Sequence, residues 1–359
     1  MGAFLIRRLF YGVLVLLGVV SLVFVLFTIL PGDPARMVLG QRADINSVEA
    51  IRKELGLDRP PLVQYAHFLN DVSPLSLHQV SKREHLLFLD PAKYGHTIRL
   101  LHWNDYTLVL KTPFLRRSYQ NKREVTAILA EAFPMTLLLA SVSILFALVF
   151  GVLIGLLAAV YDNKFLNKLI LILTVFGMSL PSFFAAILMA WIFAYLLADF
   201  THLSMFGSLF TVDDYGRGEV LSLQNLILPA ITLGIRPLAI IVELTRTSLL
   251  DAMSQDYIRT AYAKGLSRIR VIGVHALRNA MNPVITAVSG WFASLMAGAV
   301  FVEYVFDWKG IGVVIVDALE KYDLPLIMGS VLLIAVILIL INIFVDILYG
   351  ILDPRVRIT

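Results

Sequence analysis

A basic, helix-patterned segment between two apolar stretches holds the side chains best suited to recognising another molecule. Within residues 256–280, Arg259 and Lys264 can form charge-assisted hydrogen bonds with the carboxylates or backbone carbonyls of a partner protein. Gly265 can take the left-handed conformation that ends a helix, and Ser267 can cap the next helix. The pattern therefore predicts two short helices that meet at a corner, an arrangement suited to docking in a partner's groove.

Two alanines in the first of these helices support docking. Ala261 and Ala263 keep the helix narrow enough to enter a groove. The alternative is an ordinary amphipathic helix that lies at the membrane interface without a protein partner. Short motifs carry a real risk of false matches, so other segments must decide between the two interpretations.

Motifs for covalent or hydrolytic chemistry are absent from the sequence. No Gly-Lys dipeptide occurs, so the chain lacks the Walker A loop that cradles the phosphates of ATP. It also lacks the His-Glu-x-x-His and Gly-x-Ser-x-Gly motifs of metalloproteases and serine hydrolases. With no cysteine, it has no thiol for catalysis or metal binding. We therefore predict no catalytic residue, no metal site and no cofactor bound by this chain.

Composition places the chain in a membrane. Hydrophobic residues make up 58% of its 359 residues, charged residues make up 16%, and the mean hydropathy is +0.81, which is too apolar for a soluble globule. A membrane span needs about 20 predominantly apolar residues. We expect an all-α, polytopic protein with six transmembrane helices, at residues 9–30, 135–160, 169–198, 226–242, 284–302 and 324–345. The first run is too long for a signal peptide, so we expect it to be retained.

Charge asymmetry predicts the orientation of these spans. The loop at residues 251–283 is mainly basic, whereas the loops at 199–224 and 303–323 are mainly acidic. By the positive-inside rule, the basic loop and both termini are cytoplasmic, and the acidic loops are extracytoplasmic. Residues 35–132 then lie outside as well. The sequence thus predicts a multi-pass membrane protein with both termini in the cytoplasm.

This topology divides the chain into parts. We expect an N-terminal transmembrane helix, an extracytoplasmic region, a five-helix core that includes the basic loop, and a cytoplasmic tail, at residues 1–34, 35–132, 133–349 and 350–359. In the extracytoplasmic region, Asn46-Ser-Val-Glu49 is typical of a capping box that opens a short helix, and residues 106–110 favour a strand.

The third expected span contains a proline. Pro181, with Ser179 and Ser182 beside it, breaks or kinks the helix. The backbone groups that this frees are tolerated where a helix lines a cavity or is buried in protein. We expect these three residues either to line a translocation pathway or to form a purely structural kink.

Three separated motifs resemble those of binding-protein-dependent ABC importer permeases, and they occur in the order found in that family. The spacing Arg259-Thr-Ala-x3-Gly265-x9-His275-x-Leu277 resembles the family's EAA loop, in the variant typical of peptide permeases. The start of the chain, through Leu30-Pro-Gly-Asp-Pro34, is similar to the B-type subunits of dipeptide and oligopeptide permeases. Residues 301–312, which read Phe-Val-Glu-Tyr-Val-Phe-Asp-Trp-Lys-Gly-Ile-Gly, resemble the family's second signature.

The sequence departs from the family pattern in three places. The family usually has proline where Lys309 stands. General EAA loops begin with an acidic residue where Arg259 stands, although arginine is common in the peptide subfamily. Residues 74–112 resemble an insertion between the first two spans, and they form either a lineage-specific loop, which we favour, or an additional contact with a substrate-binding protein.

The resemblance implies a type I ABC importer permease of the inner, cytoplasmic membrane that supplies half of a pore for dipeptides or oligopeptides. It also implies a homologous second permease subunit, two cytoplasmic ATPase subunits that use ATP and magnesium, an extracytoplasmic substrate-binding protein, surrounding membrane lipid, and no nucleic acid. The residues that would dock on the ATPase are Arg259, Thr260, Ala261, Lys264, Gly265, Leu266, His275 and Leu277.

Alternatives remain open at this point. Nickel or another small solute is an alternative cargo for a permease of the same family. A passive channel would explain the spans but not the basic loop, and an intramembrane enzyme would need a catalytic motif that the sequence lacks.

Overall fold

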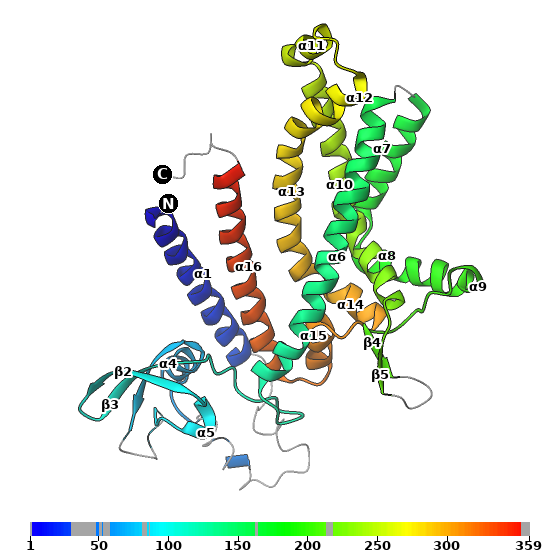
Figure 1. Ribbon diagram of the computed structural model, residues 1–359. Coiled ribbons are helices and arrows are strands. Elements are labelled where there is room, and N and C mark those ends of the chain that lie inside the picture. The colour runs from blue at the N-terminus through cyan, green and yellow to red at the C-terminus, as the bar shows by residue number, and fades with distance from the viewer. Residues whose placement is uncertain are drawn as a thin grey trace. The chain divides into compact units, whose positions relative to one another are not determined.

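The structure is a computed structural model that describes residues 2–29, 48–49, 52, 58–80, 85, 87–161, 164–212 and 218–352. The motif Leu30-Pro-Gly-Asp-Pro34, most of the predicted helix that begins at Asn46, and the tail after residue 352 lie outside these ranges. The chain forms two compact units (Figure 1). We call Gly2–Glu131 with Val314–Ile337 the sheet unit, and Ala132–Val313 with Leu338–Thr359 the core unit.

Helices dominate the described residues, as the sequence predicts. Four are long and apolar enough to cross a membrane unbroken: α1 (Gly2–Ile29), α6 (Val125–Val160), α10 (Gln224–Met253) and α16 (Leu324–Leu352). Two further pairs of helices reach that length only when taken together, and both pairs are bent. The described residues therefore hold six spans if each bent pair crosses once.

The bent pairs fall on the third and fifth predicted spans. α7 (Lys164–Ser179) meets α8 (Ser182–Met189) and the π-helix η1 (Ala190–Leu196) at 112°. α12 (Arg268–Arg270), the π-helix η2 (Val271–Ala276) and α13 (Leu277–Gly298) meet α14 (Val300–Phe306) at 59°. The break that the sequence predicts in the third span is therefore present, because Pro181 supplies no N–H to the helix ladder and stands at the N-cap of α8.

Small residues bring α6 and α10 into close contact in the core unit. Gly151 and Gly155 lie one turn apart on α6, and a Cβ atom on Gly155 would lie 2.7 Å from the carbonyl oxygen of Val242. Glycines four residues apart let two helix backbones approach in this way. Ala147, Ile241 and Val284 extend the buried contact from α6 and α10 to α13.

The second family signature folds into a tight turn in the core unit. Trp308 is fully buried, and its indole N–H donates to the carbonyl oxygen of Met135 (3.0 Å). Glu303 is also fully buried and accepts a hydrogen bond from the Gly312 N–H (2.6 Å), so this acid, which the sequence analysis counted as a loop charge, is an internal acceptor. The Lys309 N–H donates to the Ser208 hydroxyl (3.4 Å), a bond that the family's usual proline could not make.

Short elements connect these helices. In the core unit they are α9 (Ala198–Thr201), the hairpin of β4 (Phe210–Val212) and β5 (Glu219–Leu221), and α11 (Asp256–Ala263) between α10 and α12. α15 (Ile311–Glu320) begins in the core unit and continues in the sheet unit.

The sheet unit contains a three-stranded antiparallel sheet within residues 58–124, which we call the sheet region. Its elements are α4 (Pro61–Val72), β1 (Leu75–Gln79), α5 (Pro91–Tyr94), β2 (Thr97–Trp103) and β3 (Tyr106–Lys111), with the strand order β1-β3-β2. The strand predicted at 106–110 is confirmed as β3. The otherwise helical fold therefore carries a small sheet in the segment that the sequence left largely unassigned.

A buried acid organises the interior of the sheet region. Asp71 is 2% exposed, and it accepts hydrogen bonds from the Lys93 ammonium (2.9 Å) and the Tyr94 hydroxyl (2.7 Å). The Lys111 ammonium donates to the backbone carbonyl oxygen of Asp71 (2.5 Å). Burial alone would raise the pKa of Asp71, but the charges of Lys93 and His67, together with these hydrogen bonds, outweigh burial and hold the pKa below its ordinary value.

Candidate functional site

The glycine corner of the basic loop forms as predicted. Gly265 has a φ of +77°, and its N–H donates to the carbonyl oxygen of Tyr262 (2.9 Å). The Leu266 N–H reaches back to the carbonyl oxygen of Ala261 (3.3 Å). These two bonds are those of a Schellman motif, which ends a helix with a left-handed residue just after its last turn. We call residues 251–283 the docking loop.

The second helix of the corner starts differently from the prediction. Ser267 stands at the N-cap of α12 in an extended conformation, but its side chain makes no capping hydrogen bond to any described residue. Its backbone carbonyl oxygen accepts from the Val271 N–H (3.0 Å) instead. The guanidinium of Arg268 donates to the carbonyl oxygen of Val160 (3.1 Å), which fastens α12 to the end of α6.

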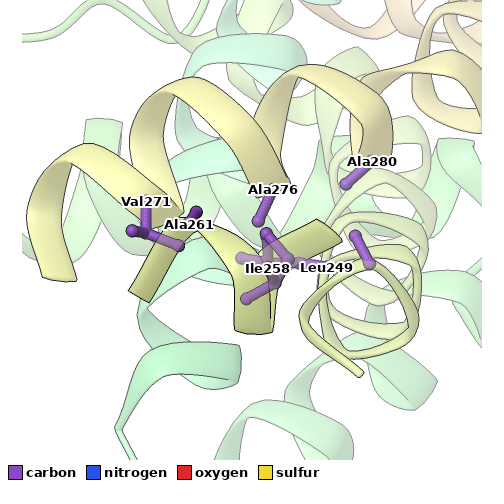
Figure 2. Close-up of a cluster of buried hydrophobic side chains, with 7 residues drawn as sticks. Leu249, Ile258, Ala261, Val271, Ala276 and Ala280 are labelled. Carbon is purple, nitrogen blue, oxygen red and sulfur yellow. The ribbon is translucent and has the colours of Figure 1, made fainter. Parts of the chain in front are cut away.

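A buried apolar cluster forms the base of the docking loop (Figure 2). Leu249 comes from α10, Ile258 and Ala261 from α11, and Ala276 and Ala280 from η2 and α13. The end of α6 packs against the same cluster. Because one cluster joins the loop to three long helices, a displacement of the loop must be transmitted to the ends of those helices.

This cluster corrects one part of the docking prediction. Ala261 was expected to slim the helix for a partner, yet its methyl group is buried among the loop's own residues, and Ala263 lies on the exposed side of α11. Leu266 and Leu277 also pack against the cluster. The requirement for a small side chain at Ala261 therefore arises inside this chain.

The other predicted docking residues reach the surface. Arg259, Thr260, Lys264 and Gly265 are exposed, whereas His275 is half-buried. Arg259 pairs with Asp256 across one turn of α11 (3.3 Å), and both side chains remain largely open to solvent. A surface pair of this kind contributes little to stability, so both groups remain available to a partner.

Sequence reasoning missed the apolar part of this surface. Ile269 is 86% exposed and stands between Arg268 and Arg270, and Val274, Tyr257 and Tyr262 are exposed nearby on the same loop. An isoleucine between two arginines in an amphipathic segment was a usable signal. Exposed apolar side chains surrounded by charges are typical of a protein-binding surface.

The proline break of the third span is confirmed. Ser179 ends α7 and is exposed, and its hydroxyl donates to the carbonyl oxygen of Val175 (2.8 Å) on its own helix. Pro181 is exposed and Ser182 is half-buried. On α13, an open hollow of about 210 Å³ is lined by Ala287, Gly290, Trp291 and Ser294, which share one helical face.

Among the residues that the structure describes, no three His, Asp or Glu side chains lie close enough together to hold a metal ion. The core unit combines a basic loop that exposes cations and apolar side chains with long apolar helices.

Comparison with known families decides what kind of membrane core this is. Residues 151–358 match the family described as the binding-protein-dependent transport system inner membrane component, and residues 1–81 match that system's N-terminal membrane component. The chain belongs to this family. It is therefore a permease of the ABC importer type, as the three motifs indicated. Residues 82–150, which include β2 and β3, lie in neither match.

Relatives match this permease along almost its whole length. The glutathione transport system permease protein GsiC of Salmonella typhimurium is 34% identical over 354 residues, which cover 99% of this chain and 98% of that protein. The protein of the same name from Escherichia coli is 35% identical over 355 residues, with the same coverage of both chains. A solved structure titled as an inward-facing MetNI methionine ABC transporter aligns with 16% identity and a TM-score of 0.47, covering 64% of this chain and 97% of that chain.

Proposed function

We propose that this permease supplies one half of the transmembrane pathway of an ATP-driven importer for small peptides. The observation that carries the proposal is the docking loop: a surface of exposed cations and apolar side chains fixed to the ends of α6, α10 and α13 by one buried cluster. A passive channel has no use for such a surface, whereas an importer driven by separate ATPases requires one.

The docking loop is suited to transmitting movement. Its outer side presents Arg259, Lys264 and Ile269 to a partner, and its inner side is packed against three helices. A partner that closes on ATP would push on the outer side, and the packed base would carry the push to the helices because such interiors are nearly incompressible. The permease itself would hydrolyse nothing. Two cytoplasmic ATPase subunits would use ATP and magnesium.

Small peptides are the cargo best supported by the relatives. Two permeases named for glutathione transport, a tripeptide, align with this chain from end to end. The peptide variant of the loop, with Arg259 at its start, agrees with them. Nickel or another small solute remains the second candidate. An extracytoplasmic binding protein would select the cargo before it reaches the permease.

Two features of the core unit suit a pathway. The break at Ser179, Pro181 and Ser182 places exposed polar and backbone groups inside a span, which is tolerated where a helix lines a cavity. The hollow beside Trp291 on α13 lies within another span. A homologous second permease would cover both features and complete the pathway, so we expect the isolated chain to form no complete pore.

We further propose the topology that the charges predict. The docking loop and both termini would be cytoplasmic, and the sheet region would be extracytoplasmic. An inner-membrane location follows from the family. With this orientation, the ATPases and the binding protein would meet the permease on opposite sides of the membrane.

The test is transport by the reconstituted complex. Liposomes that contain both permeases, the ATPases and the binding protein should accumulate a labelled tripeptide only with ATP, and the chain alone should neither hydrolyse ATP nor leak peptide. Leakage through the chain alone at channel-like rates would show that the protein is a passive channel and not part of an importer. Accumulation of Ni²⁺ without peptide would show that the cargo is nickel, while the importer function would still hold.

A matched pair of variants tests the docking surface. Ile269→Ser should raise the Kd between ATPase and permease about tenfold, a loss of about 1.4 kcal/mol, and should thereby lower the amount of ATPase that copurifies with the permease. Val212→Ser, which truncates a comparably exposed apolar residue on β4, should leave that amount unchanged. Equal recovery of ATPase with both variants would argue against the docking role.

A further inference from the structure

One face of the three-stranded sheet carries apolar or aromatic side chains at every position but one of its three successive rows, the exception being the buried Gln79 of β1. The strand register places Leu75, Leu110 and Ile98 side by side across β1, β3 and β2. In the next row, Leu77 and Leu101 flank Leu108 of β3 in the same way. Side chains alternate between faces along β1 and β3, and a register shift between Arg99 and Leu101 of β2 pairs Leu101 with Leu108.

Aromatic residues end this face. Tyr106 of β3 and Trp103 of β2 are paired in the register and are both exposed, Trp103 to 81% of its surface. We call the surface formed by these three rows the apolar sheet face. The residues between them on β3, Thr107 and Val109, are buried on the opposite side of the sheet.

An exposed surface of this kind is unusual outside membrane spans. The three rows include no charged side chain, and the edge strand β2 is open to a neighbour. Contiguous apolar patches on soluble parts of a protein mark contact with a partner or a membrane. The apolar sheet face therefore needs an occupant.

Packing inside the sheet unit holds this face close to a membrane span. Tyr65 of α4 shares a hydrogen bond with the Ser21 hydroxyl of α1 (2.5 Å), and Phe68 of α4 stacks on Phe24 (ring centroids 5.9 Å apart). Both α1 residues lie inside the candidate span Ile6–Leu26. α4 is thus packed against the part of α1 that crosses the bilayer.

The sheet is tied directly to α4. The side chain of Asn70 accepts a hydrogen bond from the Leu77 N–H (2.9 Å) and donates to its carbonyl oxygen (3.1 Å). Figure 1 shows β2 and β3 beside α4, at the end of α1 away from the N-terminus. These contacts keep the sheet within a helix diameter or so of a span, about 10 Å.

The chemistry of the face favours lipid over a transient protein partner. A binding protein that docks and leaves in each transport cycle would return this face to water every time, and non-obligate interfaces are only about as apolar as the rest of a protein surface. A bilayer covers the face permanently. Trp103 and Tyr106 at its end match the aromatic residues that concentrate at headgroup level, where an apolar ring and a polar tip are both satisfied.

We propose that the apolar sheet face rests on the bilayer, at the boundary between headgroups and acyl chains of the leaflet that the C-terminal end of α1 enters. The sheet would then act as an interfacial anchor that fixes the position of α1 and α4 at the membrane surface. This inference depends on neither the cargo nor the orientation of the permease, so it can fail or hold independently of the transport function.

Spin labels on opposite faces of β2 provide the test. The chain has no cysteine, so Leu101→Cys and Arg99→Cys each create a single labelling site. Leu101 lies on the apolar sheet face, and Arg99 pairs with Val109 on the opposite face while remaining exposed at the sheet edge. The full permease would be labelled in vesicles of phosphatidylethanolamine and phosphatidylglycerol with cysteine-free partner subunits.

Collisions with two relaxation agents separate the possible occupants. The label at Leu101→Cys should collide often with oxygen, which concentrates in lipid, and rarely with a water-soluble nickel chelate, and the label at Arg99→Cys should show the reverse. Frequent nickel collisions at both sites would mean that the face is open to water. Rare collisions with both agents at Leu101→Cys would mean burial by another subunit. Protection that appears only after adding the binding protein would assign the face to that protein.

Each of these last three outcomes would overturn the proposal. Ile98→Cys, on the same face, should repeat the lipid pattern and guards against a local effect of one substitution.

Discussion

The docking loop and the sheet region distribute their side chains in opposite ways. The docking loop buries small apolar residues, such as Ala261 and Ala276, and exposes most of its cations. The sheet region buries an acid and a lysine, Asp71 and Lys111, with the half-buried Lys93 beside them, and exposes an apolar sheet face. The docking loop has the distribution typical of a surface in water, with charges outside and apolar residues inside. The sheet region has the reverse, with charges inside and leucines outside.

This difference indicates whether water or lipid surrounds each region. A small domain in water gains most by burying apolar surface, and burying charges costs free energy unless they are paired. The sheet region accepts that cost and leaves leucines outside. Contact of the apolar sheet face with lipid removes the contradiction, because the exposed leucines then lie against an apolar medium.

The strongest test of this comparison is the side of the membrane on which each region lies. We expect Arg99→Cys to react fully with a membrane-impermeant maleimide in intact cells, and Lys264→Cys to react only after the membrane is permeabilised, because the charge pattern places the regions on opposite sides. Both residues are exposed, so access alone does not separate them. Reaction of both cysteines in intact cells would contradict the predicted topology and the cytoplasmic location of the docking loop.

The next largest effect concerns the buried acid. Asp71→Asn should destabilise the sheet region by about 3 kcal/mol, the low end of the range for removing one partner of a buried ion pair, since Lys93 is partly exposed to solvent. Hydrogen exchange of residues 75–111, measured by mass spectrometry, reports the change. Asp58→Asn removes an exposed acid that pairs only with its neighbour Arg59 among its described contacts (3.8 Å) and should leave the exchange unchanged. Similar protection in both variants would show that the charged interior does not hold the sheet.

Mild acid should weaken the same interior through His78. Burial, together with the charge of Lys111, lowers its pKa from 6.5 to about 4. Between these values the unfolded chain binds a proton that the folded chain does not, so stability should fall as the pH drops from about 6.5 to about 4, by at most about 3 kcal/mol. The charges nearby are Lys111, Asp71 and Lys93.

Hydrogen exchange of the sheet region across that pH interval measures this loss. His78→Gln should flatten the dependence, and an unchanged slope in that variant would assign it to other groups. The docking loop should show no comparable dependence on His78.

The smallest effect lies at the corner of the docking loop. Gly265→Ala should cost about 1–2 kcal/mol, because an L-residue is strained at a φ of +77° even though a Cβ atom there would meet no other atom. The number of ATP molecules hydrolysed per peptide transported should rise. Gly273→Ala is the matched control, since it also opens into free space but has no positive φ. Equal coupling in both variants would mean that the corner's shape does not matter to the ATPase.

Features set by local backbone energetics could be predicted from the sequence. The left-handed end of α11 at Gly265, the break at Pro181 and the strand at Tyr106–Lys111 all follow from what individual residues permit or favour. Composition determined the membrane class, and three ordered motifs determined the family, because both depend on residue types alone.

Features set by contacts between distant segments were not predictable in this way. Glu303 was indistinguishable from a loop acid until the turn brought the Gly312 N–H to it, and Arg268 reached the carbonyl oxygen of Val160 from 108 residues away. Ala261 and Ala263 are the same residue type two positions apart, and only the packing of α11 decided which was buried.

The apolar sheet face shows the same division most clearly. The sequence contains every leucine of that face, but leucines occur throughout this chain. Only the register of β1, β3 and β2 places Leu75, Leu110 and Ile98 in one row, and a shift by one residue would turn a strand's side chains to the other side. Local preferences determined that strands form, whereas pairing between strands up to tens of residues apart determined what they display.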